Sequence, residues 1–186
     1  MMRRKIVCLS LLFVSSQLFA ASGHDSDLTM KNWASHPSIV AIRDMYKETN
    51  ANRKSGTYTT ERRRFDVRSA QCGDEPVREL ILVRDDRQRV RLFVKVSVSR
   101  KGEPYSVHRY YDASGKLRFV SSGSIMVSYR NYLDKSGKVF WSLEKDYMKY
   151  RPGKLDNNSG LISPLRAKDT PALFHAAQSC PSIDKD

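Results

Sequence analysis

Hydrophobic and polar residues alternate along residues 89–99, and this is the clearest structural signal in the chain. Valine or leucine occupies every even position from Val90 to Val98, while arginine, phenylalanine, lysine and serine fill the odd positions from 89 to 99. Alternation with a period of two is typical of a β-strand that has one buried side and one water-facing side. We therefore expect this strand to lie in an antiparallel sheet with one hydrophobic face and one wet face.

Comparable segments occupy the middle of the chain, and turn-forming residues separate them. The predicted strands are 58–68, 77–84, 89–99, 105–111, 116–121, 125–133 and 138–147.

Two of the separators repeat the sequence Asp-x-Ser-Gly-Lys, at 112–116 and 134–138, and 85–89 is a degenerate third version. An aspartate bonds well to the backbone of its own turn, and glycine accepts a positive φ, so these loops are predicted to be hairpin turns. A calcium site is the alternative reading. It is disfavoured because the repeated loops carry one carboxylate each, whereas Ca²⁺ takes six to eight oxygen ligands.

A helical periodicity precedes the strands. Ile39, Ile42, Met45 and Tyr46 fall on one helical face after Pro37, which predicts an amphipathic helix of about four turns. A second, short helix is predicted at 172–178. The predicted fold class is α+β: an N-terminal amphipathic helix packed on an antiparallel β-meander of six or seven strands, with a short C-terminal helix. The predicted core residues are Ile39, Ile42, Val90, Leu92, Val94, Val96, Ile125, Val127, Val139, Trp141 and Leu143.

The N-terminus has the order of a secretory signal peptide. Arg3, Arg4 and Lys5 precede a short apolar run, and small residues follow at 20–23. A retained anchor is the alternative, but the run is shorter than the roughly 20 apolar residues of a membrane span. We expect a cleaved signal at 1–22, a flexible start at 23–34 and a single domain at 35–186. The product is then secreted or periplasmic, with no transmembrane segment after cleavage.

Two cysteines remain once the signal peptide is removed. An even number of cysteines in an exported chain favours a disulfide, here Cys72–Cys180. A redox or metal pair is the rival reading, but neither cysteine belongs to a Cys-x-x-Cys motif or has a histidine at metal-ligand spacing. We therefore expect the bridge to tie the C-terminal segment back onto the body of the domain.

Positive charge is the strongest compositional bias. The chain has 33 Lys and Arg against 20 Asp and Glu, a net charge of +13. The first 22 residues hold three basic residues and no acid, so the processed chain would carry +10. A basic, aromatic-bearing sheet face is predicted to bind an acidic protein or an envelope polyanion. Its residues are Arg62, Arg64, Arg87, Arg89, Arg91, Phe93 and Lys95. Nucleic acid is a less favoured partner than these two. The alternative to binding is that the positive charge only keeps the protein soluble by mutual repulsion.

Catalytic and cofactor motifs are missing from the sequence. None of the recognised nucleophile, zinc-protease, phosphate-loop or dinucleotide patterns occurs, and no pair of the four histidines has metal-ligand spacing. We expect a non-catalytic binding protein without cofactor or metal. The alternative is a hydrolase with a site near His108. A concave pocket converging on His108 would favour the hydrolase, and a broad Arg-rich face without a pocket would favour the binder.

Overall fold

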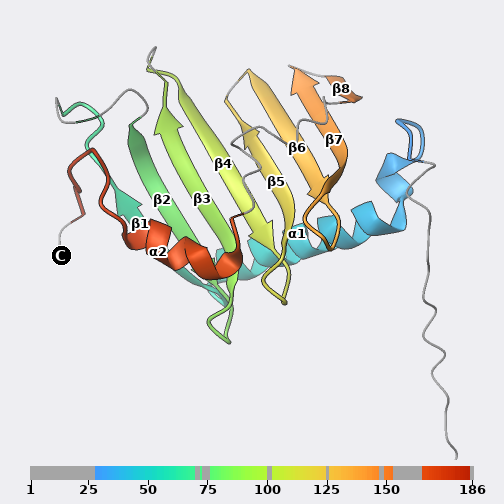
Figure 1. Cartoon of the computed structure of the whole chain (residues 1–186), viewed down its shortest axis with the longest axis horizontal. Coiled ribbons are helices and arrows are strands. Elements are labelled where there is room, and N and C mark those ends of the chain that lie inside the picture. The colour runs from blue at the N-terminus through green and yellow to red at the C-terminus, as the bar shows by residue number, and fades with distance from the viewer. Residues whose placement is uncertain are drawn as a thin grey trace, which may run out of the picture.

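The computed structural model describes residues 28–69, 72, 76–99, 102–124, 126–146, 149–152 and 165–184. Within these residues the chain forms one eight-stranded antiparallel sheet whose strands follow one another in sequence order (Figure 1). The strands are β1 (Thr59–Arg64), β2 (Val77–Arg84), β3 (Val90–Val98), β4 (Pro104–Tyr111), β5 (Leu117–Gly123), β6 (Val127–Leu133), β7 (Val139–Asp146) and β8 (Lys149–Pro152). The predicted antiparallel meander is thus confirmed. Strand β8 was missed, because the sequence after Tyr150 is rich in turn-forming residues and reads as a loop.

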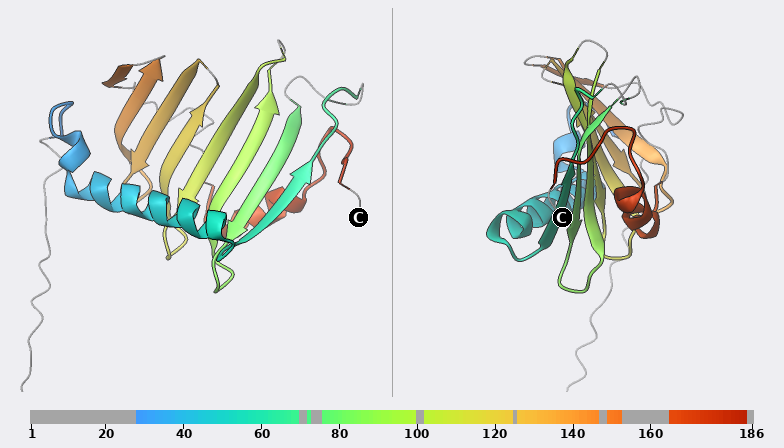
Figure 2. Two further views of the ribbon diagram at one scale, coloured as in Figure 1. Left: turned by 180° about the vertical axis from the view of Figure 1, so that it is seen from behind. Right: turned by 90° about the vertical axis from the view of Figure 1, so that its left-hand side faces the viewer.

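Two α-helices accompany the sheet. Helix α1 (Pro37–Ser55) carries proline in its first turn, where no backbone N–H is needed, and is followed by Gly56, which has a φ of 78°. Near the C-terminus the 3-10 helix η4 (Ala167–Asp169) runs into helix α2 (Thr170–His175). Figure 2 shows α1 crossing one face of the sheet, and its edge-on view shows α2 on the opposite side.

Each face of the sheet carries its own buried cluster. On the α1 face, Ile39 and Ile42 pack with strand residues such as Leu92 and Tyr132. On the α2 face, Phe174 packs in one cluster with Phe65, which follows β1, and with strand residues that include Leu80, Leu82, Phe93, Val120 and Leu133. Both faces are hydrophobic near α1 and α2, so the expectation of one wet face is wrong. The continuous apolar run of β2, Leu80–Val83, is the sequence signal for burial on both faces.

Most of the predicted core is buried. Ile39, Ile42, Val90, Leu92, Val94, Val139 and Leu143 are all at most 6% exposed, whereas Val96, Val127 and Trp141 are only partly buried. Ile125 and the signal segment 1–22 lie outside the described residues.

Ordered packing begins before residue 35. In the segment expected to be a flexible start, the described part contributes Leu28, Met30 and Trp33 to the α1-face cluster, and Trp33 opens the 3-10 helix η2 (Trp33–Ser35). The ring of Trp33 lies 6.4 Å from the ring of Tyr132 on β6. Apolar residues spaced two or three apart in a polar stretch gave too weak a pattern to predict this contact.

The repeated Asp-x-Ser-Gly-Lys sequences form two nearly identical hairpin turns. In the first, Asp112 Oδ1 accepts hydrogen bonds from the backbone N–H of Ser114 (2.9 Å) and of Lys116 (3.0 Å). In the second, Asp134 Oδ1 accepts them from the N–H of Ser136 (2.8 Å) and of Lys138 (3.0 Å). These bonds satisfy turn amides that would otherwise depend on water.

The degenerate third version adopts the same turn. Asp85 Oδ1 accepts hydrogen bonds from the backbone N–H of Arg87 (3.1 Å) and of Arg89 (2.9 Å). Gln88 stands where the other two copies have Gly115 and Gly137, and like them it has a positive φ. All three turns lie at the same end of the sheet, where β2–β3, β4–β5 and β6–β7 are joined (Figure 1). The prediction of three repeated turns is confirmed.

A β-bulge follows each of these turns, and it changes which face the residues occupy. The register steps from Arg84↔Val90 to Val83↔Leu92, which leaves Arg91 as the extra residue, and Arg118 and Phe140 are the extra residues of the next two hairpins. Val90 therefore belongs to the α2-face cluster while Leu92 belongs to the α1-face cluster. The simple alternation read from the sequence breaks at this bulge.

The two bulge arginines make the same contacts. Arg91 Nε donates to the carbonyl of Tyr111 at 3.2 Å, and Arg118 Nε donates to the carbonyl of Leu133 at 3.1 Å. Each also approaches the aspartate of its own turn, Asp85 for Arg91 (3.5 Å) and Asp112 for Arg118 (3.4 Å). Tyr111 and Leu133 end the first strand of the next hairpin, so each arginine ties one hairpin to the following one.

The predicted disulfide, Cys72–Cys180, is confirmed and joins residues 108 positions apart. Beyond it the chain runs beside the edge strand β1. Phe65 and Ser182 form a bridge, Asp66 N–H donates to the Pro181 carbonyl (2.9 Å) and Ile183 N–H donates to the Arg64 carbonyl (3.0 Å). Among the described residues, neither helix has the length and apolarity needed to cross a membrane.

Candidate functional site

The seven residues of the predicted basic face do not lie on one surface. Arg87 and Arg89 lie in the β2–β3 turn, and Phe93 and Lys95 lie on the α2 face of β3. Arg62 and Arg64 are on β1, where they pair with Glu79 (3.1 Å) and Asp184 (3.2 Å).

Two of the seven are not accessible. Arg91 is 6% exposed and Phe93 is 4% exposed. Arg91 Nη1 lies 3.3 Å from the hydroxyl of Tyr58, and its guanidinium lies over the Tyr58 ring at 5.7 Å. The expectation that these two side chains face water is wrong. Arg91 occupies a bulge, and Phe93 packs under the C-terminal segment. The alternation of hydrophobic and polar residues within this strand indicates neither the bulge nor the covering segment. Ligand binding by the remaining, exposed arginines stays a prediction.

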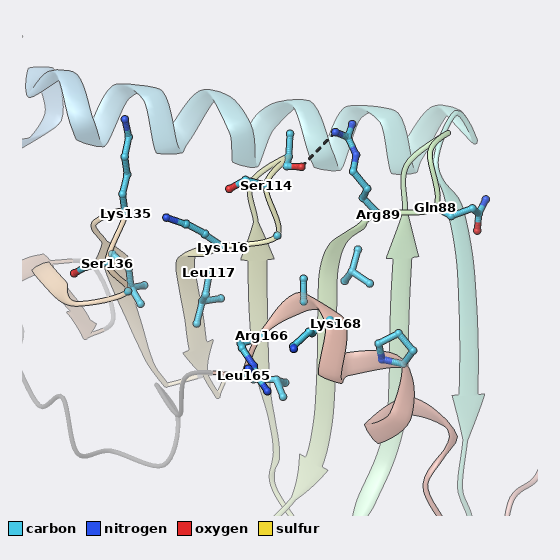
Figure 3. Close-up of a pocket in the computed structure, with 17 residues that line it drawn as sticks. Gln88, Arg89, Ser114, Lys116, Leu117, Lys135, Ser136, Leu165, Arg166 and Lys168 are labelled. Carbon is cyan, nitrogen blue, oxygen red and sulfur yellow. Dashed lines mark hydrogen bonds between the residues drawn. The ribbon is translucent and has the colours of Figure 1, made fainter. Parts of the chain in front are cut away.

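A cavity of about 760 Å³ lies at the turn end of the sheet on the α2 face. We call it the turn-end cavity. Figure 3 shows the turns that carry Ser114 and Ser136 on one side of it, and the segment with Leu165, Arg166 and Lys168 on the other. Its volume falls within the range of about 300–1,000 Å³ that is typical of small-molecule sites.

Five cations line the turn-end cavity, and no carboxylate does so among the described residues: Arg89, Lys116, Lys135, Arg166 and Lys168. Arg89 is neutralised by the buried carboxylate of Asp85 (2.8 Å), and Arg166 pairs with Asp169 (2.8 Å). Within the described part of the chain the three lysines make no ion pair. A positive potential therefore remains at the cavity, supplied mainly by Lys116, Lys135 and Lys168.

The interior of the turn-end cavity is apolar. Its hydrophobic lining comes from strand ends and from the C-terminal segment: Val90, Ala113, Leu117, Leu133, Leu165, Ala167 and Pro171. Val90, Leu117, Leu133 and Ala167 also belong to the α2-face cluster. The cavity thus offers a ligand a hydrophobic surface continuous with the protein core, with lysine ammonium groups around it.

Several amides of these turns are already used within the turns themselves. The amides of Lys116 and Lys138 already donate to Asp112 and Asp134. Burial alone would raise the pKa of these two carboxyls, but the hydrogen bonds from Ser114 and Ser136 and from the turn amides outweigh it, so each pKa is held below its usual range. Both aspartates are therefore ionised at neutral pH, and their carboxylates already accept hydrogen bonds from their own turns. The part of the chain that the structure describes holds no cluster of three His, Cys, Asp or Glu side chains fit for a metal.

His108 lines a separate cavity of about 280 Å³ on the opposite, α1 face of the sheet. Its Nε2 lies 3.1 Å from Ser106 Oγ on the same strand. Burial, and secondarily the charge of Arg53, lower the pKa of His108, so its imidazole is neutral at neutral pH. The described residues that line this cavity include no carboxylate able to orient the histidine. A cavity at His108 exists, as expected for a hydrolase, but a basic cavity lies elsewhere. The molecule therefore matches neither a single pocket at His108 nor a broad Arg-rich face without a pocket.

Sequence reasoning missed the lysines of the turn-end cavity. Lys116 and Lys135 lie in the repeated turns, which were analysed for their backbone chemistry alone, and Lys168 comes from a distant segment. The repetition was the available signal, since equivalent turns in a meander meet at one end of the sheet. Comparison with protein-family models, with curated proteins and with solved structures found no match for this chain.

Proposed function

We propose that this protein is an exported, non-catalytic binding protein that takes an anionic amphiphile in its turn-end cavity. The observation that carries the proposal is the combination of three lysines without ion pairs in the described structure and an apolar lining in one cavity of about 760 Å³. A ligand with a phosphate or carboxylate head and a hydrocarbon tail matches both features.

The shape of the basic region favours a small amphiphile over an extended polyanion. A polymer or an acidic protein needs a broad exposed surface of like charge, whereas the arginines of the predicted sheet face are dispersed and two of the seven residues are buried. The lysines of the turn-end cavity instead surround a hydrophobic lining. Burial of a hydrocarbon tail contributes about 0.8 kcal/mol per CH₂, so the tail supplies much of the affinity and the head supplies selectivity.

Export is supported by three independent features. The N-terminal residues have the order of charge, apolar run and small residues that signal peptides have. The Cys72–Cys180 bridge is of the kind that persists in oxidising compartments. The excess of 33 basic over 20 acidic residues suits a protein that meets anionic envelope lipids.

The test is calorimetric titration of the oxidised protein with dodecyl phosphate below its micellar concentration. The matched probes are dodecyl maltoside, with the same tail but no charge, and inorganic phosphate, with the charge but no tail. Dodecyl phosphate should bind most tightly, and its affinity should fall as salt rises, because the lysines are exposed to screening.

A triple variant Lys116→Gln, Lys135→Gln, Lys168→Gln localises the site. We expect it to bind dodecyl phosphate about tenfold more weakly, since three exposed charge pairs contribute roughly 0.2–1 kcal/mol each. The control Lys31→Gln, Lys47→Gln, Lys54→Gln removes the same charge outside the turn-end cavity and should bind as the wild type does. Equal weakening in both variants would show a delocalised effect of net charge and would contradict the proposal.

A hydrolase remains the second candidate, because Ser106 Oγ and His108 Nε2 are at nucleophile–base distance inside an open cavity. Release of nitrophenol from short-chain nitrophenyl esters, lost in both Ser106→Ala and His108→Ala, would support it. Equal rates in wild type and variants would eliminate it.

A further inference from the structure

Three rows of side chains cross the α1 face of β4, β5 and β6, and their chemistry changes from row to row. The row nearest the turns is aromatic and packs in the α1-face cluster, whereas the next two are polar. Each row consists of residues paired across the three strands: Tyr110–Phe119–Tyr132, then His108–Ser121–Arg130, then Ser106–Gly123–Ser128. The sheet therefore presents an aromatic border followed by hydroxyl, imidazole and guanidinium groups.

Helix α1 forms the other wall beside these polar rows. One cavity of about 250 Å³ and a second of about 280 Å³ lie between α1 and the sheet, and both are lined by Tyr46 and Ser121. Because they share these residues, the two cavities are adjoining parts of one cleft, which we call the α1-face cleft. It lies across the sheet from the turn-end cavity, whose wall is formed by η4 and the start of α2.

Cations line the α1-face cleft along its length, with no acidic residue among its described lining: Arg43, Lys47, Arg53 and Arg130. Arg53 makes no ion pair within the described residues. Lys47 is paired with the exposed Asp44, at 3.6 Å, and with no other acid that the structure describes. Guanidinium groups bind carboxylates in a planar, two-bonded geometry, and two of the four cations belong to opposite walls, Arg53 on α1 and Arg130 on β6.

An aromatic ring and a series of hydroxyls complete the lining. Tyr46 is 40% exposed, and its ring lies 5.0 Å from that of Tyr110 and 5.6 Å from that of Phe119. It is thus a firmly supported ring with an accessible surface. Serine residues from three strands supply hydroxyl groups, and Asn50 of α1 adds an amide: Ser106, Ser121, Ser124 and Ser128 are the serines on this face or its loop.

We propose that the α1-face cleft binds an acidic saccharide. The carboxylates of the saccharide meet Arg53 and Arg130, its hydroxyls meet the serines and Asn50, and the apolar side of one sugar ring lies against Tyr46. The two adjoining cavities accommodate successive sugar units. This site is separate from the proposed amphiphile site, and the two proposals can fail independently.

The experiment is calorimetric titration of the oxidised protein with tetragalacturonate, with maltotetraose as the uncharged tetrasaccharide. Tetragalacturonate should bind and maltotetraose should not. The double variant Arg53→Gln, Arg130→Gln should bind tetragalacturonate at least about tenfold more weakly, because hydrogen bonds to charged groups are the stronger ones. Lys54→Gln, Lys138→Gln removes the same charge at positions that do not line the cleft and should leave binding unchanged.

Two further readouts separate a local loss from general destabilisation. Tyr46→Ala should weaken binding, and the ring proton resonances of His108 should shift when wild type is titrated with tetragalacturonate. The triple lysine variant of the turn-end cavity should bind tetragalacturonate as wild type does. Equal binding of maltotetraose, undiminished binding by the Arg53 and Arg130 variant, or unmoved His108 resonances at saturation would each overturn the proposal.

Discussion

Gln88 in the β2–β3 turn has the left-handed backbone conformation that Gly115 has in the β4–β5 turn, with φ values of 59° and 78°. A side chain in this conformation costs about 1 kcal/mol or more. We expect Gln88→Gly to raise the free energy of unfolding by up to about 1 kcal/mol, since the relieved strain exceeds the added freedom of the unfolded chain. Urea unfolding measures it, with Gln88→Ala as the control that keeps the strain. A glycine variant no more stable than the alanine variant would refute this.

Gly115 and Gly137 occupy equivalent turn positions in different surroundings. A Cβ added at Gly115 would lie 3.3 Å from Ala167 Cβ, whereas one at Gly137 would meet no atom within 4 Å. Gly137→Ala should therefore destabilise by about 1–2 kcal/mol through backbone strain alone. Gly115→Ala should cost more and should also disturb the turn-end cavity, because Ala167 is part of its lining. Denaturant unfolding and dodecyl phosphate titration of both variants test this, and equal losses of stability would argue against it.

Arg91 is structural in this fold, although the sequence pointed to it as a binding residue. Removing its charge would leave the carboxylate of Asp85, which is 1% exposed, with Arg89 as its remaining cationic partner. Breaking a buried ion pair from one side costs about 3–5 kcal/mol, and the surviving Arg89 places Arg91→Gln toward the lower end of that range. The exposed Arg87→Gln should change stability by less than about 0.5 kcal/mol. Thermal unfolding monitored by circular dichroism compares the two, and similar melting temperatures would contradict the assignment.

His108 gives the protein a stability term that disappears on acidification. Burial and the charge of Arg53 lower its pKa in the folded state, so protonation favours the unfolded chain. The stabilisation is fully present above the unfolded pKa of about 6.5 and is lost as the pH falls through that value toward the folded pKa.

The variant His108→Gln removes this titration. The stability advantage of wild type over His108→Gln should shrink between pH 7.5 and pH 5, as measured by urea unfolding at each pH. The substitution leaves Arg53, Arg130 and Tyr46, which line the same cleft, in place, so the difference reports the histidine. An advantage that stays constant across this range would exclude the effect.

The Cys72–Cys180 bridge should control ligand binding as well as stability. Its loss typically costs about 2–5 kcal/mol, and the segment that it retains includes Leu165–Pro171, one wall of the turn-end cavity. Reduction should therefore weaken dodecyl phosphate binding before the sheet unfolds. The double variant Cys72→Ser, Cys180→Ser should behave like the reduced protein and should not respond to reductant. Unchanged affinity in the variant would show that the wall holds without the bridge.

Local sequence patterns predicted the strands and turns of this fold correctly, but they predicted less well which segments pack against them. Turn chemistry located the three hairpins, and alternation located the strand that contains Leu92 and Val94. The C-terminal segment that covers Phe93 comes from about 80 residues further along the chain, so no pattern within β3 could reveal it. The bulge at Arg91 was in principle visible, because Asp112 and Arg118 repeat the spacing of Asp85 and Arg91.

The candidate sites were less predictable than the fold. Lys116 and Lys168 become neighbours of one cavity only through the return of the C-terminal segment. Arg53 and Arg130 line one cleft because α1 lies over β4, β5 and β6, which begin 49 residues or more after the end of the helix (104 − 55 = 49). Charge clusters along the sequence pointed to Arg62 and Arg64 instead, where Glu79 and Asp184 provide partners.

The pairing of residues 181–184 with β1 has a consequence for how copies of the protein meet. An exposed edge strand offers its backbone N–H and C=O groups to any other strand. Here the N–H of Asp66 donates to the carbonyl of Pro181, and the carbonyl of Arg64 accepts from the N–H of Ile183. The nearby bridge at Cys180 keeps that segment in place. The C-terminal segment therefore shields the end of β1, at Arg64 to Asp66, against edge-to-edge self-association. Removal of residues 181–184 alone retains Cys180 and its bridge, and we expect each molecule to stay folded with the end of β1 open to a strand of a neighbour.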